Sequence, residues 1–331
     1  FIPLRHRSKV ALFAREFPSI IKKYAIELAH FQYLTPFFKD CKFMVTTHDV
    51  LFNDFKDEFS AWYRLQRNFL FKKSLEKSDI RLTVSEYSRR RIAAHYGIPE
   101  QSIHITPNAV RKAFFQSYDA ADARQYIRKN FGPENYLLYV SRIEPRKNHR
   151  MLMDAYRELR LDEQGIQLVF VGSDTLKSKK EVFEMTRMKA DYPNHFYWFS
   201  QVNDADLLRF YQGARMFVYP SKAEGFGIPP IEAAAAGVNT LCSNATAMSD
   251  FDFFGNNFFS PDNLAELKEK ILYNLQNPPQ EWELYYLREK IQQRYSWDYS
   301  AEVVHRLIEP TLQISREHSM RNLLAPGIYA R

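Results

Sequence analysis

Two glutamates eight residues apart, Glu224 and Glu232, mark the part of the sequence with the most chemical content. An apolar run at 215–219 precedes them, and the prolines at 229 and 230 suit the first turn of a helix. The segment therefore predicts a strand, a glycine-containing loop and the start of a helix.

The loop between that strand and that helix suits a glycosyl diphosphate. The start of a helix presents unpaired N–H groups and a positive dipole end to an anion. Gly225 and Gly227 let a ligand approach the backbone closely. Carboxylates fit there if they face sugar hydroxyls, because one carboxylate can accept from two adjacent hydroxyls. The alternative is an ordinary strand, turn and helix with two solvated acids.

The complete pattern E-G-F-G-x-x-x-x-E from Glu224 to Glu232 resembles the signature of the retaining GT-B glycosyltransferases of family 4, or glycosyl transferases group 1. The resemblance implies that Glu224 contacts the donor sugar and that Glu232 holds the nucleotide ribose. The backbone amides expected to hold the diphosphate are those of Gly225, Phe226, Gly227 and Ile228.

A second cluster, from Ser141 to Asn148, follows the apolar strand predicted at 136–140. It is similar to the family pattern S-R-x-x-x-x-K-N. Cations fixed at the carboxyl end of a strand stabilise the charge that a departing diphosphate gains. Arg142 and Lys147 are therefore expected to grip the diphosphate, and Arg146 is expected to face solvent.

The sequence predicts neither a metal nor a cofactor beyond the donor substrate. Its two D-x-D segments, at 204–206 and 250–252, do not follow hydrophobic strands. Asp204 is instead predicted to cap a helix. Two fixed cations also make a metal unnecessary in the predicted mechanism.

The first half of the chain supplies one further candidate, His48, which follows a strand predicted at 42–46. The resemblance places this histidine against the donor sugar from the first domain. A histidine at the end of a strand can hydrogen-bond a sugar hydroxyl or transfer a proton. In the same half, Ser85 is predicted to cap a helix that begins at Glu86.

Strands and helices alternate along both halves, which predicts an α/β fold with parallel, doubly wound sheets. The resemblance makes this a GT-B fold, with two Rossmann-like domains facing a central cleft. The expected divisions are an acceptor-binding domain at 1–120, a nucleotide-sugar-binding domain at 121–295 and a helix crossing back to the first domain at 296–331. The joint near 112–134 has a weak apolar period.

The first domain departs from the family plan. No strand with a glycine-rich loop is evident before Lys42, so the domain is expected to lack its first strands. Near the other end, residues 281–315 are predicted to be helical throughout. The expected packing anchors there are Trp282, Tyr285, Trp297, Leu307 and Ile308.

Length and composition limit the classes of protein that fit. A chain of 331 residues suits two domains of roughly 150 residues. Cys41 and Cys242 are too few for a disulfide framework, and no apolar run reaches the roughly twenty residues of a membrane span. The expected location is the cytoplasm, with peripheral contact with the inner face of the cell membrane left open.

The net charge of +7 is concentrated in the first half, where residues 1–125 hold 21 Lys and Arg against 13 Asp and Glu. An anionic membrane, an acidic acceptor or a plain solvated surface would each fit this excess. The basic, aromatic stretch from Trp62 to Lys73 could lie on a membrane or pack in a core. No nucleic-acid motif accompanies these residues, so no nucleic-acid partner is expected.

The predicted activity is retaining, metal-independent transfer of a hexosyl group from a nucleotide-diphosphate sugar to a hydroxyl of a glycan or lipid-linked acceptor. Cell-surface polysaccharide synthesis is the setting that the resemblance implies. Two alternatives stay open, namely a non-catalytic sugar-nucleotide-binding module and a GT-B nucleotide-sugar epimerase.

Overall fold

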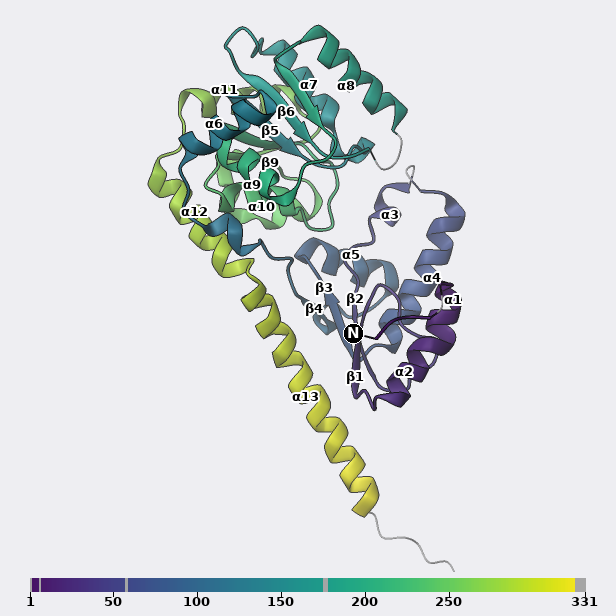
Figure 1. Ribbon diagram of the computed structural model, residues 1–331. Coiled ribbons are helices and arrows are strands. Elements are labelled where there is room, and N and C mark those ends of the chain that lie inside the picture. Colours follow the sequence, from purple (N-terminus) through teal and green to yellow (C-terminus); the bar gives the residue numbers. More distant parts are fainter. Residues whose placement is uncertain (1, 6, 57–58, 175–177, 325–331) are drawn as a thin grey trace, which may run out of the picture. The chain divides into compact units, whose positions relative to one another are not determined.

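The computed structural model describes residues 2–5, 7–56, 59–174 and 178–324, and the chain forms two compact α/β units (Figure 1). Unit 1 combines Phe1–Pro107 with Asp298–Arg331, and unit 2 is the continuous stretch Asn108–Trp297. The chain therefore changes unit at 107/108 and again at 297/298, whereas the sequence placed these changes at 120/121 and 295/296.

Unit 2 is built on a six-stranded parallel sheet with the order β10-β9-β8-β5-β6-β7. The strands are β5 (Tyr136–Val140), β6 (Gln167–Val171), β7 (Phe196–Phe199), β8 (Met216–Tyr219), β9 (Thr240–Ser243) and β10 (Phe258–Phe259). The sheet grows from β5 through β6 to β7 and then in the other direction from β8 to β10. The strand order reverses between β5 and β8, and ligands of such sheets bind at the carboxyl ends beside that reversal.

Helices cover both faces of the strands of unit 2, which accounts for their fully buried apolar runs. The helices are α6 (Ala120–Phe131), α7 (His149–Glu158), α8 (Lys179–Asp191), α9 (Asp204–Gly213), α10 (Ile228–Ala235), α11 (Leu264–Gln276) and α12 (Glu281–Arg294).

Helix α6 occupies the stretch where the sequence suggested only a joint between domains. Asp119 caps it by accepting from the amides of Ala121 and Asp122. Its buried residues are Ala123 and Ile127, so its inner face carries few large apolar side chains.

Unit 1 contains a four-stranded parallel sheet with the order β1-β2-β3-β4. The strands are β1 (Leu28–Gln32), β2 (Lys42–Thr46), β3 (Ile80–Thr83) and β4 (Ile103–Ile105). The helices are α1 (Lys9–Ala11), α2 (Phe17–Lys23), α3 (Leu51–Asp54), α4 (Ala61–Lys77), α5 (Glu86–Tyr96) and α13 (Trp297–Leu324).

One strand does precede Lys42, because β1 pairs with β2 along its whole length, but no glycine-rich loop follows it, since the first glycine of the chain is Gly97. The five residues of β1 are only partly buried or exposed, and polar His30 and Gln32 interrupt the apolar ones. A partly exposed edge strand does not need the continuous apolar run that marks a buried parallel strand.

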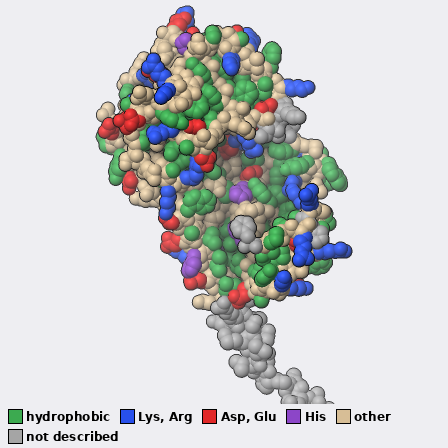
Figure 2. All heavy atoms as spheres, viewed as in Figure 1, with side chains coloured by type: hydrophobic (Ala, Val, Ile, Leu, Met, Phe, Trp, Pro, Cys, Tyr) green, Lys and Arg blue, Asp and Glu red, His purple; other side chains and the backbone are tan. Residues whose placement is uncertain are grey.

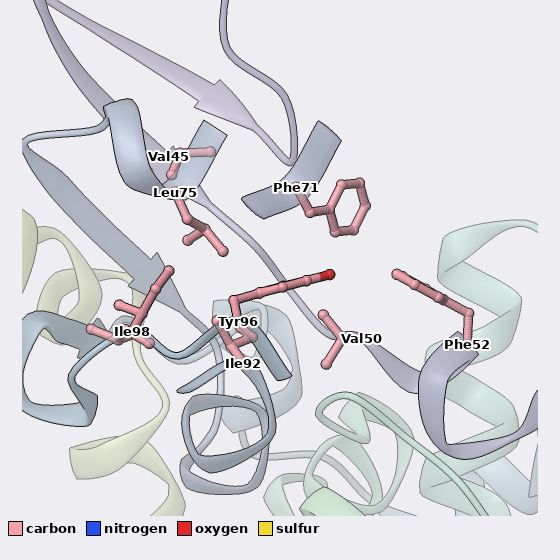
Figure 3. Close-up of a cluster of buried hydrophobic side chains, with 9 residues drawn as sticks. Val45, Val50, Phe52, Phe71, Leu75, Ile92, Tyr96 and Ile98 are labelled. Atoms are coloured by element: carbon pink, nitrogen blue, oxygen red, sulfur yellow. The ribbon is translucent and has the colours of Figure 1, made fainter. Parts of the chain in front are cut away.

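The two faces of the unit 1 sheet have separate cores. On one face, β2 contributes Val45 to a cluster with Phe71 and Leu75 of α4 and Ile92 of α5 (Figure 3). On the other, Met44, Ile80 and Leu82 pack against the α13 residues Val304, Leu307 and Ile308. Alternate residues of a strand point to opposite faces, so helix α13 covers a face that would otherwise be open.

Leu307 and Ile308 are therefore confirmed as packing anchors, but the three aromatic anchors are wrong. The exposed fractions of Trp282, Tyr285 and Trp297 are 68%, 64% and 57%. On α12 the buried residue is Ile291, and the partly buried Leu284 and Leu287 lie on the same face. That spacing leaves the aromatic residues of α12 outside the buried core.

Candidate active site

The two predicted clusters come together at the carboxyl ends of β5 and β8. These strands are neighbours in register, with Leu137 opposite Met216 and Leu138 opposite Phe217. The loops that follow them are joined by a hydrogen bond of 2.8 Å from the Lys222 amide to the Arg146 carbonyl. Residues far apart in the sequence thus form one site at the point where the strand order reverses.

The centre of this site is the buried carboxylate of Glu224. Its Oε1 accepts from the Lys147 ammonium at 2.5 Å, the Tyr219 hydroxyl at 2.6 Å and the Ser221 hydroxyl at 2.8 Å. Its Oε2 lies 3.3 Å from an Nη of Arg146. Glu224 is therefore held by two cations and two hydroxyls.

These contacts keep the Glu224 carboxylate ionised. Burial acts to raise its pKa, but Lys147 and Arg146 outweigh burial and hold the pKa below its ordinary value. Burial and the neighbouring Arg146 guanidinium lower the pKa of Lys147, against the opposite effect of Glu224. The site therefore holds a carboxylate and cations in fixed positions in a low-dielectric environment.

Of the two arginines in the loop after β5, one differs from expectation. Arg146 is not solvent-facing: its side chain is only 15% exposed, and it pairs with Glu144 at 2.6 Å and with Glu224. Arg142 is 59% exposed and lies 3.3 Å from Glu144. The 3₁₀ turn η5 (Pro145–Lys147) directs Arg146 inward, toward two buried acids that need cationic partners. No signal in the sequence identifies Arg146, because its position depends on acids that become buried only in the folded chain.

The glycine loop has the predicted form. Gly227 precedes α10 with a φ of 97°, and Pro229 and Pro230 lie in the first turn. Prolines have no N–H, so the loop and Ile228 must supply most of the amides at this helix start. A Cβ at Gly227 would lie 3.2 Å from Met248, so glycine is also favoured by the lack of space.

Within this loop, Phe226 contributes only its main chain to the open side of the site. Its ring is buried, and the ring centroid lies 5.6 Å from those of Phe251 and Tyr295. The side chain therefore anchors the loop in the core of unit 2.

Glu232 lies on α10 and accepts a hydrogen bond of 3.1 Å from the Tyr211 hydroxyl. Burial raises its pKa, while the Tyr211 hydrogen bond acts in the opposite direction. The carboxylate keeps acceptor positions beyond the one that Tyr211 uses.

Gly172 follows β6 at the same edge of the sheet, and no other residue fits its position. Its φ is +152°, and a Cβ there would lie 1.8 Å from the carbonyl oxygen of Ser141. Trp198 of β7 donates its indole N–H to the Gly172 carbonyl at 2.9 Å. This hydrogen bond fixes the orientation of the Trp198 side chain at that edge of the sheet.

His48 belongs to unit 1, where it follows β2. Its Nε2 lies 2.6 Å from Oε1 of Gln32 at the end of β1, and its ring lies 5.2 Å from that of Tyr33. Burial lowers the pKa of His48, against the opposite effect of Asp49. Gln32 was missed because it lies on the strand that the sequence did not reveal.

Of the two predicted helix caps, one is confirmed and the other is wrong. Ser85 caps α5 by accepting from the Ser88 amide at 3.1 Å. Asn203, and not Asp204, caps α9, and Asp204 pairs with Arg111 at 2.6 Å. Among the described residues, no group of three His, Cys, Asp or Glu is arranged to hold a metal ion.

Known sequences similar to this chain are glycosyltransferases. O-antigen chain mannosyltransferase B of Escherichia coli is 29% identical over 204 residues, which are 62% of this chain and 53% of that protein. O-antigen chain mannosyltransferase RfbU of Salmonella typhimurium is 27% identical over 219 residues, 66% of this chain and 56% of that protein. The chain spans about half the length of these relatives.

Known structures confirm the predicted GT-B fold of two Rossmann-like units. A glycosyltransferase from Rickettsia africae has a TM-score of 0.72 at 18% identity, covering 93% of this chain and 85% of that one. Anabaena HepE, solved with UDP, has a TM-score of 0.73 at 14% identity, covering 90% and 81%.

Family profiles cover both halves of the sequence. The profile described as Glycosyltransferase Family 4 matches residues 1–114. The profile described as Glycosyl transferases group 1 matches residues 122–293, the stretch that carries Arg142, Lys147, Glu224 and Glu232. With more than half of its length in that second match, this chain belongs to the glycosyl transferases group 1 family.

Proposed function

We propose that this chain transfers a hexosyl group from a nucleotide-diphosphate sugar to a hydroxyl of a glycan or lipid-linked acceptor, with retention at the anomeric carbon. The observation that carries the proposal is the contact between Lys147 and Glu224, which unites the two clusters beside the glycine loop. A cation, a carboxylate and loop amides in one place suit a diphosphate joined to a sugar.

Each part of the donor has a matching group in the proposal. Lys147, Arg142 and the amides from Gly225 to Ile228 hold the diphosphate. Glu232 accepts from the ribose hydroxyls. Glu224 accepts from a sugar hydroxyl through Oε2, which has fewer protein contacts than Oε1. His48, on unit 1, is proposed as a further group that can hydrogen-bond a sugar hydroxyl.

The proposed reaction takes place on one face of the sugar. The bond between the anomeric carbon and the diphosphate oxygen breaks, and the acceptor oxygen bonds to the same face of that carbon. The acceptor proton passes to the departing diphosphate, which leaves with both bonding electrons. The fixed cations stabilise the charge on this leaving group and make a metal unnecessary in the proposal.

Mannose is the sugar to test first, in cell-surface polysaccharide synthesis. The support is indirect: relatives are named as O-antigen mannosyltransferases, and one is named as GDP-mannose-dependent. UDP and UDP-glucose are the second choice, because HepE was solved with them.

The proposed location is the cytoplasm, with unit 1 in peripheral contact with an anionic membrane. Cys41 and Cys242 are free thiols, which fits a reducing compartment. On α4, Trp62, Leu65 and Phe69 are 73%, 65% and 63% exposed. Figure 2 shows hydrophobic and basic side chains intermixed over the part of unit 1 that carries α1 and α4. Exposed aromatics beside basic residues suit an interfacial helix.

Membrane contact can be tested by sedimentation with vesicles that contain phosphatidylglycerol. Native protein should sediment with these vesicles, and the Trp62→Ser/Phe69→Ser variant should remain in solution. Trp297→Ser, which removes an exposed tryptophan from α13, is the matched control. Equal sedimentation of all three proteins would contradict the contact.

Among the described residues, no helix has the length and apolar character to cross a bilayer.

Donor binding can be tested by the melting temperature of the protein with GDP, UDP, ADP and their hexose derivatives. One nucleotide series should raise the melting temperature of native protein, and Glu232→Ala should respond much less. Glu269→Ala, an exposed acid on α11, should respond like native protein.

Product analysis then separates transfer from the alternatives. Transfer requires an acceptor and yields the same anomeric configuration as the donor, which NMR can assign. An epimerase would change the nucleotide sugar without an acceptor. Binding without turnover, by the full-length protein, would support a non-catalytic module instead.

A further inference from the structure

A pocket of about 580 Å³ lies at the amino ends of β9 and β10 in unit 2. Asn239 precedes β9, and Asn257 precedes β10. Tyr273 and Asn277 come from the end of α11, and Trp282 and Tyr286 from the start of α12. Its volume is within the range of small-molecule sites.

The floor of this pocket is a network of amides. Asn239 donates to Asn274 at 3.0 Å, Asn257 donates to Asn239 at 3.4 Å, and Asn274 donates to the Lys270 carbonyl at 3.0 Å. Asn239 and Asn274 are buried, so this floor is fixed. Each amide offers two donors and an acceptor, and the partners named here use only part of that capacity. Planar amides with spare donors and acceptors match neighbouring sugar hydroxyls.

The walls of the pocket are aromatic. Tyr273, Trp282 and Tyr286 are 62%, 68% and 58% exposed. Trp282 and Tyr286 are four residues apart on α12 and share one side of the helix. An indole or phenol ring presents a flat apolar face, on which the C–H face of a pyranose can pack.

The charges at the pocket suit a neutral ligand. Of the residues that line it, all of them described, only Glu283 and Lys290 are charged. Glu283 accepts from the Gln280 amide in a capping box at 2.7 Å, and the Lys290 ammonium lies 4.5 Å from the Tyr286 ring centroid. No pair of free cations is present among these lining residues to hold a phosphate.

The pocket is separate from the proposed donor site. All six strands are parallel, so their carboxyl ends lie at one edge of the sheet and their amino ends at the other. Lys147, Glu224 and Gly172 follow strand ends at the first edge, whereas Asn239 and Asn257 precede strands at the second. A ligand in the pocket would leave the donor site open.

We propose that this pocket binds a neutral oligosaccharide, as a second holding site for the glycan that the protein extends. The choice of glycan rests on the proposed function, but the binding itself rests on the amides and aromatic rings. A second contact would raise the local concentration of the glycan near the donor site.

The test is calorimetric titration of the full chain with mannotetraose and, separately, with maltotetraose. At least one should bind with a dissociation constant of about 1 mM or lower. Trp282→Ala should weaken that binding about tenfold or more, because it removes the largest exposed ring. Tyr285→Ala is the matched control, since Tyr285 is an equally exposed aromatic of α12 outside the lining and should bind as native protein does.

Two outcomes would overturn the proposal. One is a lack of saturable binding of either tetrasaccharide by native protein, and the other is binding that Trp282→Ala leaves unchanged. Glu232→Ala distinguishes this inference from the proposed function, because it should lose the nucleotide response but bind the tetrasaccharide normally. A protein that binds the tetrasaccharide and no nucleotide would support the pocket and contradict the donor site.

Discussion

The Lys147 ammonium and the Glu224 carboxylate lie 2.5 Å apart, although 77 residues separate them in the chain. Both side chains are buried, and they come from the loops after β5 and β8. The pair therefore holds the two loops together, and in the proposed function it also places a cation and an anion beside a charged donor.

Replacing Lys147 should show how strongly its pairing with Glu224 affects the stability of the fold. Lys147→Met leaves a buried carboxylate with Arg146 as its remaining cation, so the free energy of unfolding should fall by about 3 kcal/mol. The double variant Lys147→Met/Glu224→Gln should recover part of that loss, as measured by urea unfolding. Additive effects of the two single substitutions would contradict direct coupling.

Substitutions at the two arginines of the same loop should have different effects: one on the reaction with the donor, the other on folding stability. Arg142→Ala, at an exposed side chain, should change the free energy of unfolding by no more than about 0.5 kcal/mol but lower kcat/KM for the donor about 100-fold. Arg146→Ala removes one cationic partner from each of the buried acids Glu144 and Glu224, so it should destabilise by about 2 kcal/mol or more. Urea unfolding and steady-state kinetics on both variants check this. Equal stability of the two variants would show that Arg146 has no such structural role.

Gly172 provides a test of close backbone approach. Gly172→Ala places a Cβ 1.8 Å from the Ser141 carbonyl oxygen, so β5 and β6 must separate at the edge that carries Arg142. The melting temperature should fall far more than in Gly97→Ala. At Gly97 the φ of +66° is strained, but no atom lies within 4 Å of the added Cβ, and strain of this kind costs about 1 kcal/mol. If the melting temperature falls equally in the two variants, the loss in Gly172→Ala comes from the strained backbone angle and not from the contact with Ser141.

His149 should make unit 2 sensitive to acid. Its ring is buried between Tyr139 and Phe170, and burial lowers its pKa to about 3. The unfolded chain takes up a proton as the pH falls through about 6.5, whereas the folded chain does not. Stability should therefore fall between pH 6.5 and pH 3, by up to about 1.4 kcal/mol per pH unit.

The check is urea unfolding of native protein and His149→Phe at pH 7 and pH 5. The variant keeps an aromatic ring but cannot titrate, so it should lose less stability at pH 5. His195→Asn, at a partly exposed histidine of the same unit, is the control and should follow native protein. An equal loss in native protein and His149→Phe would assign the acid sensitivity to other groups.

Burial on both faces decided which strands the sequence could reveal. The bounds of β2 and β5 are those predicted, because each is a short and largely buried apolar run. Strand β1 and helix α6 bury few large apolar residues, so the sequence marks them weakly. Their positions depend on pairing with β2 and on packing in unit 2, which are contacts between distant parts of the chain.

The candidate site, too, could be predicted only in part. Spacing within one loop predicted the Glu224 and Lys147 clusters, and their meeting follows from the order of the parallel strands. The inward course of Arg146 depends on a single 3₁₀ turn and on two buried acids, one of them in another loop. A linear pattern does not record such a contact.

Helix α13 also determines the order in which the two units can finish folding during synthesis on the ribosome. Its residues Val304, Leu307 and Ile308 cover the face of the unit 1 sheet formed by Met44, Ile80 and Leu82. They emerge only after the whole of unit 2 has been translated, since synthesis runs from the amino terminus. The second unit to appear can therefore finish folding before the first, whose nascent apolar surface must wait for the last helix or be shielded by a chaperone.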